Sequence, residues 1–354
     1  MFEQMYHETF AHVQAPAELK QEVLAMANWN EQKRPVRRSR RLALILAAAV
    51  LLTVSGLAAT WRLWQPKMAE LFRAGPETQQ ELLDSGTTQV LGLSDSDNGV
   101  TLTAEQIIGD DNGFFILFRI DSDDPELLNY MVNPRLEVTY NQGLEDLMYS
   151  SNWRYVREGQ QVWDEETGGF VPMTPMYFYW QGHVRDGADL AGRTITFTID
   201  ELADYLTDGN GVRVWNGHLE LTLPLDYEPA DTLVLDADAR VDTCQGQVHI
   251  IGVEFTPISV VLCFEAQAQT DLLDVKALTL ADGSVVELIS SSGTAYRLED
   301  GAYRQLFDLK TALVLEDAPV SLTLEAVTGA EELPNDGWLV TETTQCVVPL
   351  TEKK

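Results

Sequence analysis

An uncharged apolar stretch near the N-terminus divides this sequence into two unequal parts. Residues 42–60 read LALILAAAVLLTVSGLAAT and contain no charged side chain. A helix of this length extends about 28 Å, close to the roughly 30 Å hydrocarbon core of a bilayer. A buried core helix would normally carry a polar stripe, which this stretch lacks. We therefore expect one transmembrane helix, with predicted bounds 42–64.

Charge is distributed very unevenly around this predicted span. Residues 33–41 contain six arginines and lysines and no acid, whereas Trp61 and Trp64 follow the uncharged stretch, as expected at headgroup depth. The net charge of the chain is −31. Residues 1–67 have a net charge of +4, and the remaining residues have a net charge of −35. The positive-inside rule then predicts a single-pass protein of the cell membrane, with residues 1–41 in the cytoplasm and the acidic part outside. Such an acidic body would also repel nucleic acid.

A cleaved signal peptide is the alternative interpretation, because small residues at 56–59 resemble a cleavage site. However, the 41 residues before the span are far longer than a normal n-region and have a helical pattern of their own. We therefore expect an uncleaved anchor.

The segment before the span has the apolar spacing of two short helices, separated near Pro16. Two helices of this size bury little surface by themselves, so they either pack weakly on each other or dock on a partner, and we predict a partner. His7, Glu8 and His12 do not suggest a zinc site, because the two imidazoles are five residues apart instead of four. The predicted partner-binding residues are Phe2, Tyr6, Phe10, Leu19, Val23 and Met26.

The part after the span alternates short β-rich runs with turn pairs such as Asn98-Gly99, Asn112-Gly113, Asn216-Gly217 and Asp282-Gly283. Many short strands with frequent turns are typical of antiparallel sandwiches. We predict a mainly β protein with two tandem immunoglobulin-like β-sandwich domains outside the membrane, preceded by a short cytoplasmic helical segment and one transmembrane helix. The predicted parts are the cytoplasmic segment 1–41, the span 42–64, a helical juxtamembrane stalk 65–86, a first sandwich 87–227 and a second sandwich 228–354.

Acidic runs at 95–99, 110–113 and 121–124 could either bind calcium or form turns. An EF-hand loop needs glycine at its sixth position and glutamate at its twelfth. Counted from Asp95, Gly99 is fifth and Gln106 is twelfth. We therefore favour turns.

An aromatic-rich region could either bind a ligand or fill the core. Residues 176–184 place aromatic side chains on both alternating faces, so one face could be exposed and stack a sugar or a peptide. Burial is the interpretation that we favour, because aromatic residues most often serve the core. The region contains Trp153, Tyr155, Trp163, Phe170, Tyr177, Phe178, Tyr179 and Trp180.

Candidate chemistry is otherwise sparse. Cys244 and Cys263 lie on or beside neighbouring predicted strands and could form a disulfide or remain free thiols, and Cys346 is left over. The histidines at 183, 218 and 249 have no cysteine or carboxylate at metal-ligand spacing. The outer part contains neither a phosphate-binding loop nor a nucleophile elbow. We predict no enzymatic activity, no cofactor and no metal site.

Four stretches, at 10–20, 71–86, 97–120 and 248–262, carry a family resemblance. They include the helix start Ala15-Pro-Ala-Glu-Leu-Lys20 before the basic run, and the strand opening Asp97-Asn-Gly-Val-Thr-Leu-Thr-Ala-Glu105. The chain resembles a family of single-pass membrane proteins of Gram-positive bacteria. These proteins carry a domain of unknown function (number 4179) and are often labelled anti-sigma factors.

The resemblance implies a sensor whose outer part receives an envelope signal and whose cytoplasmic helices hold or release a sigma factor. One departure is that residues 1–41 contain no cysteine, so they lack the zinc-binding His-x-x-x-Cys-x-x-Cys segment of many anti-sigma proteins. The alternative function is a cell-surface ligand-binding or adhesion protein with no regulatory output.

Overall fold

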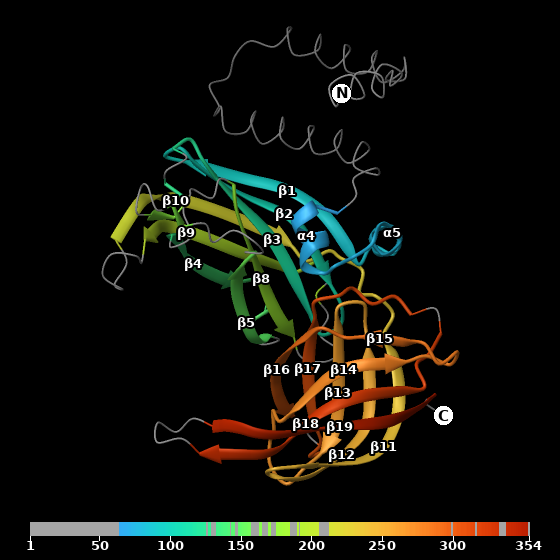
Figure 1. Ribbon diagram of the computed structural model, residues 1–354. Helices are drawn as coiled ribbons and strands as arrows, with labels where there is room; N and C mark the ends of the chain where they lie inside the picture. The colour runs from blue at the N-terminus through green and yellow to red at the C-terminus, as the bar shows by residue number, and fades with distance from the viewer. Residues whose placement is uncertain are drawn as a thin grey trace, which may run out of the picture. The chain divides into compact units, whose positions relative to one another are not determined.

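The computed structural model describes residues 64–352, except 125–126, 129–131, 142, 146–147, 157–162, 165–168, 171–174, 185–189, 191, 205–211, 299, 316 and 333–337. The described residues belong to one compact unit and are mainly β-strand, as predicted (Figure 1). No helix among them is long and apolar enough to cross a bilayer. The predicted cytoplasmic segment and the apolar stretch 42–60 lie outside this part of the chain.

Two short helices open the described chain, α4 (Pro66–Leu71) and α5 (Pro76–Asp84). Each has proline near its first position, where the missing N–H costs nothing and the fixed φ suits a helix. Gly86 follows α5 with a φ of 78°, a left-handed conformation that glycine adopts without strain. Both helices lie within the stretch 65–86 that was predicted to be helical.

The first β region contains two antiparallel sheets that share one apolar core. The five-stranded sheet has the order β1-β2-β3-β8-β5, and the three-stranded sheet has the order β10-β9-β4. A separate two-stranded ribbon is formed by β6 (Trp163–Asp164) and β7 (Gly169–Phe170). The strands of the two larger sheets are β1 (Thr88–Asp97), β2 (Val100–Gly109), β3 (Gly113–Ser122), β4 (Val132–Tyr140), β5 (Met148–Tyr155), β8 (Met176–Val184), β9 (Thr194–Asp204) and β10 (Val212–Pro224).

Strands β2, β3 and β8 are buried on both faces, which in β3 explains the continuous apolar run Phe114–Phe118. Alternate side chains point to opposite faces of a strand. Phe114, Ile116 and Phe118 therefore join the core shared with the three-stranded sheet. Phe115 and Leu117 join a second cluster under the helices.

The second β region is one continuous antiparallel sheet with the order β15-β14-β18-β19-β11-β12-β13-β17-β16. Side chains from both ends of this sheet share one core, and β14 contacts β16, so the sheet curls around that core. We predicted two separate sheets for this region, and the structure instead has one sheet. Its strands are β11 (Leu233–Thr243), β12 (Gly246–Phe255), β13 (Ser259–Glu265), β14 (Leu273–Thr279), β15 (Val285–Glu287), β16 (Ser290–Arg297), β17 (Tyr303–Leu309), β18 (Ser321–Glu332) and β19 (Trp338–Glu352).

Two of the turns predicted from Asn-Gly and Asp-Gly pairs are present in the structure, and a third is not. Asn98-Gly99 joins β1 to β2 with φ angles of 47° and 77°, and Asp282-Gly283 lies in the turn between β14 and β15, both as predicted. The predicted turn at Asn216-Gly217 is wrong, because both residues lie within β10 at a register shift. A Cβ at Gly217 would lie 2.3 Å from the ring of Trp215, so this glycine makes room for the ring.

Gly109, at the end of β2, offers a sharp test of core packing. A Cβ built at Gly109 would lie 2.2 Å from the ring of Tyr227, whose hydroxyl donates to the Asp110 carbonyl oxygen at 3.2 Å. We expect Gly109→Ala to lower the free energy of unfolding by about 1–3 kcal/mol, because the buried ring cannot move aside freely. Thermal unfolding of the full-length chain measures this loss.

Gly252→Ala, within β12, is the matched control for Gly109→Ala. The nearest atom to a Cβ there is 3.5 Å away, which is ordinary contact. This change should be neutral or stabilising by about 0.5–1 kcal/mol. Equal effects of the two substitutions would contradict the packing described at Gly109.

Candidate functional site

The first element of the candidate site is a helical layer, residues Trp64–Asp84, that covers the outer face of the five-stranded sheet. Phe72 is 1% exposed, and its ring makes edge contacts with Trp64 and with Phe115, at centroid distances of 6.1 and 5.1 Å. Met68 and Leu82 are buried in the same apolar cluster. Because isolated helices this short are marginal in water, packing on the sheet must hold them.

The helical layer also contacts the second β region. Ile258, in the turn between β12 and β13, is buried in the same cluster as Phe72. The backbone N–H of Ala312 donates to the carbonyl oxygen of Phe72 at 2.7 Å. The layer therefore touches both β regions at once.

Polar contacts fix the chain from its first described residue. Trp64 is 3% exposed, and its Nε1–H donates to the carbonyl oxygen of Gln79 at 3.1 Å. The backbone N–H of Gln65 donates to Oε1 of the buried Gln106 at 2.8 Å, and Gln106 Nε2 donates to Thr88 Oγ1 at 2.8 Å. The predicted position of Trp64 at headgroup depth is therefore wrong, because its ring lies in the protein core.

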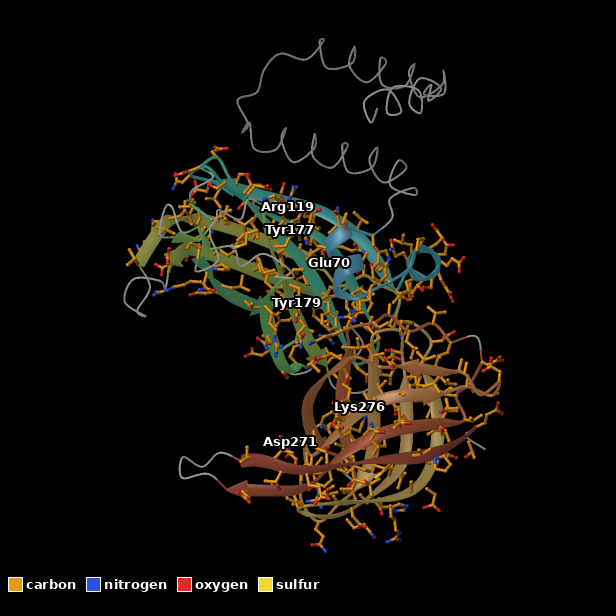
Figure 2. All side chains as sticks on the ribbon, in the orientation of Figure 1. Glu70, Arg119, Tyr177, Tyr179, Asp271 and Lys276 are labelled. Carbon is orange, nitrogen blue, oxygen red and sulfur yellow. The ribbon has the colours of Figure 1, made fainter. Side chains whose placement is uncertain are left out.

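The predicted aromatic stripe on β8 is covered by this layer. Phe178 and Trp180 lie in the shared core of the first β region, and Tyr179 is buried beneath the helices. Figure 2 shows Tyr177 beside Arg119, its register partner on β3, and Tyr179 farther along β8. Burial raises the pKa of Tyr179. Burial is thus confirmed for Phe178, Tyr179 and Trp180, and Tyr177 is half-buried. The side chains of Trp153, Tyr155, Trp163 and Phe170 lie outside the described part.

A buried carboxylate, Asp110, joins the two β regions. Its Oδ1 accepts the backbone N–H groups of Asn112 and Gly113 at 2.8 and 2.9 Å, which shapes the turn between β2 and β3. Its Oδ2 accepts the hydroxyls of Thr256 and Ser259, in the second β region, at 2.5 and 2.7 Å. Burial raises the pKa of Asp110, and these four hydrogen bonds oppose that shift.

The raised pKa of Asp110 makes a prediction about pH. The pKa of Asp110 is ordinarily 3.8 in the unfolded chain and is higher in the folded protein. At a pH between these two pKa values, Asp110 is protonated in the folded protein and ionised in the unfolded chain. The stability contributed by this group is therefore fully present below the unfolded pKa and is lost as the pH rises through the folded pKa. In Asp110→Asn the amide oxygen can still accept the two backbone N–H groups, and its nitrogen can donate to the two hydroxyls, without titrating.

We expect the difference in melting temperature between wild type and Asp110→Asn to shift in favour of the variant as the pH rises from about 4 to about 8. The difference isolates this group, because the many other carboxylates titrate in both proteins. A difference that stays constant, or that shifts toward wild type, would contradict the burial of an ionisable group at this position.

Three further hydrogen bonds cross the same junction, and a fourth, between Arg304 and Glu254, lies within the second β region. His183 Nε2–H donates to Asp308 Oδ1 at 2.9 Å, and Gln181 Nε2 donates to Asp308 Oδ2 at 3.1 Å. Arg304 donates to Glu254 Oε2 at 2.5 Å and to Asn112 Oδ1 at 3.4 Å. Sequence reasoning missed all of these groups, because the partners are 50 to 192 residues apart. No local spacing could have revealed them.

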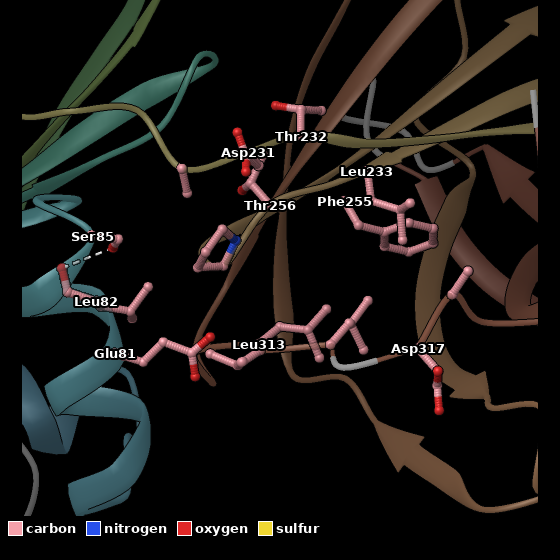
Figure 3. A pocket seen from close by; sticks show the side chains of 15 residues that line it. Glu81, Leu82, Ser85, Asp231, Thr232, Leu233, Phe255, Thr256, Leu313 and Asp317 are labelled. Carbon is pink, nitrogen blue, oxygen red and sulfur yellow. Dashed lines mark hydrogen bonds between the residues drawn. The ribbon is translucent and has the colours of Figure 1, made fainter.

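A cavity of about 480 Å³ opens beside this junction (Figure 3). Glu81, Leu82 and Ser85 of the helical layer form one side of it. The remaining lining comes from the start of the second β region and from its loops at 255–257 and 313–318. The described lining residues are Glu81, Leu82, Ser85, Ala230, Asp231, Thr232, Leu233, Phe255, Thr256, Pro257, Leu313, Val314, Leu315, Asp317 and Ala318.

The acidic run at 95–99 makes contacts within the protein. Asp95 and Asp97 lie on β1 and accept backbone N–H groups of β10, from Glu220 at 2.8 Å and from His218 at 2.9 Å. They join the edges of the two sheets of the first β region. Within the described ranges, no three histidine, cysteine, aspartate or glutamate side chains gather where they could hold a metal ion.

The remaining predicted residues divide into two groups. Cys244 is exposed, Cys263 and Cys346 are half-buried, and all three are free thiols, so the alternative of a Cys244–Cys263 disulfide is wrong. The six predicted partner-binding residues, Phe2, Tyr6, Phe10, Leu19, Val23 and Met26, lie outside the described residues.

Comparisons with known proteins address the resemblance. Residues 36–122 match a family described as "Domain of unknown function (DUF4179)", which confirms the predicted domain of unknown function. Comparison with curated proteins found no match. A solved structure described as "The crystal structure of the conserved domain protein from Bacillus anthracis" is similar, with a TM-score of 0.46 and 14% identity. The similarity covers 76% of this chain and 93% of that chain.

Proposed function

We propose that the protein is a single-pass, membrane-anchored sensor with an anti-sigma-factor-like regulatory output. Residues 42–60 would span the cell membrane, with residues 1–41 in the cytoplasm and both β regions outside. The basic flank and the uncharged stretch support this topology. The family match adds support, because its bounds, 36–122, include this stretch and extend to the end of β3.

An immunoglobulin-like sandwich remains our proposal for the first β region. Its two antiparallel sheets share one core, as the sheets of such a sandwich do. The proposed role is regulatory and not enzymatic, because the sequence carries no motif for nucleophilic or phosphate chemistry.

One observation carries the proposal, namely the position of the helical layer. Trp64 follows the last residue of the apolar stretch, Thr60, by only four positions and is buried among α4, α5 and the sheet. The layer is held by both β regions, through Phe115 on one side and Ile258 on the other. A change at the junction of the β regions would therefore move residues directly beside the proposed span.

The predicted output is a partner on the cytoplasmic helices. Affinity capture of the full-length protein from detergent-solubilised membranes of its host, followed by mass spectrometry, should recover a sigma factor. A version without residues 1–30 should lose it. Phe10→Asp with Leu19→Asp should lose the same partner, because charges on the apolar stripe would prevent its burial.

A cell-surface binding or adhesion module is the second candidate, and the cavity beside the junction favours it. In that case residues 1–41 would only set the topology. Identical partner lists with and without residues 1–30 would support this candidate and contradict the regulatory proposal.

A further inference from the structure

We propose that the cavity beside the junction binds a small organic cation that carries an apolar group. The proposal rests on the sensor function above, since it names the class of ligand that the sensor would receive. A volume of about 480 Å³ lies within the range of ordinary ligand sites.

The apolar part of the cavity comes from two elements that are distant in sequence. Phe255 and Leu313 of the second β region are buried there, and Leu82 of α5 is buried on the opposite side. Leu233, Pro257 and other half-buried residues complete this surface. Such a surface favours an aromatic or branched aliphatic group, which would leave water on binding.

The charged side chains among the described lining residues are Glu81, Asp231 and Asp317, and all three are exposed. No lysine, arginine or histidine is among these described residues. Figure 3 shows Glu81 reaching from α5 toward Leu313, while Asp317 lies beyond Leu313 and points away from Glu81. Within the described part of the chain, no side-chain hydrogen bond or ion pair involves these three carboxylates. A bound ammonium or guanidinium group would supply the missing counter-charge.

The position of the cavity connects this ligand to the proposed function. Glu81, Leu82 and Ser85 belong to the helical layer, whereas Phe255 and Leu313 belong to the second β region. A ligand that touches both would favour the conformation in which they are in contact. Binding would thereby hold the segment that follows the proposed span.

The test uses the full-length chain in phosphatidylcholine nanodiscs and the probe 2-(4-fluorophenyl)ethylguanidine. The ¹⁹F resonance of the probe should broaden with the protein and not with empty nanodiscs. The urea analogue, which is neutral and nearly isosteric, and guanidine itself, which lacks the apolar group, should each bind at least about tenfold more weakly. Binding of the probe should weaken as the salt concentration rises.

Variants locate the binding. Glu81→Gln and Asp317→Asn should each weaken binding by about two- to fivefold, because a partly exposed ion pair contributes modestly. Ala318→Phe should fill the cavity and abolish binding. Glu77→Gln, on the exposed part of the same helix and outside the cavity, is the matched control and should bind as wild type does.

The outcomes separate this proposal from the proposed function. Absence of binding, equal binding of the urea analogue, or unchanged binding by the Glu81 and Asp317 variants would overturn it, even if residues 1–30 capture a sigma factor. Binding without such a partner would support it and contradict only the regulatory output. A blocked Phe-Arg dipeptide amide carries the same two groups on a peptide. Tighter binding of this amide than of the probe would indicate that the ligand is a peptide, and weaker binding would indicate a free small molecule.

Discussion

Replacing Phe72 with alanine should lower the free energy of unfolding by about 3–5 kcal/mol, the range for deleting a large buried aromatic side chain. The ring is 1% exposed and lies between Trp64 and Phe115, so its removal leaves a void at the centre of the helical layer. The cost should appear as a fall in melting temperature of about 2–4 °C for each kcal/mol.

Phe72→Leu is the control for this substitution, because leucine keeps most of the apolar volume and should cost much less. Phe307→Ala, in the core of the second β region, should destabilise that region by a similar amount without opening the helical layer. An unchanged melting temperature in Phe72→Ala would mean that the layer does not contribute to the folded state.

Replacing Arg304 with alanine should lower the free energy of unfolding by about 3–5 kcal/mol, as expected when one partner of a buried ion pair is removed. The Arg304 side chain is 3% exposed and the Glu254 side chain 18% exposed, and their atoms lie 2.5 Å apart. The substitution removes the cation that faces Glu254 and a donor to Asn112 of the first β region.

A double variant separates the ion pair from simple packing. Arg304→Met with Glu254→Leu should recover much of the lost stability, because apolar residues of similar volume often replace a buried ion pair without net cost. Arg240→Ala, at an exposed arginine of β11, is the matched control and should change stability by no more than about 0.5 kcal/mol. A loss in Arg304→Ala no larger than in this control would contradict the buried pair.

Much of the β architecture could be predicted from local patterns, because strand periodicity and turn residues act over a few positions. Residues Val100–Ile108 and Phe114–Ile120 are recognisable as β-rich runs, and Asn98-Gly99 marks the turn before them. Strands β1, β11 and β16 are hard to recognise, because acidic, alanine or serine residues interrupt their apolar alternation. In β1 the acids that suggested a loop accept backbone hydrogen bonds from β10, a contact that no local pattern reveals.

The candidate site was less predictable, because it depends on contacts between distant segments. The helices at 66–84 were predicted, but the burial of Trp64 and Phe72 depends on Ile258, which lies almost 200 positions later. Asp110 was expected in a surface turn, and its second role with Thr256 and Ser259 required the second β region to be placed beside the first. Residues that bridge separate sheets carry no signature in one sequence.

The most direct test of the central claim is hydrogen exchange over residues 66–84 of the full-length protein in nanodiscs. Helices of six and nine residues have little stability alone, so slow exchange of their amides requires packing on both β regions. We predict strong protection in wild type, and a selective loss over this segment in Ile258→Ala, whose substitution lies in the second β region. Rapid exchange of the segment in wild type would contradict the account, because helices that open freely could not transmit a change at the junction.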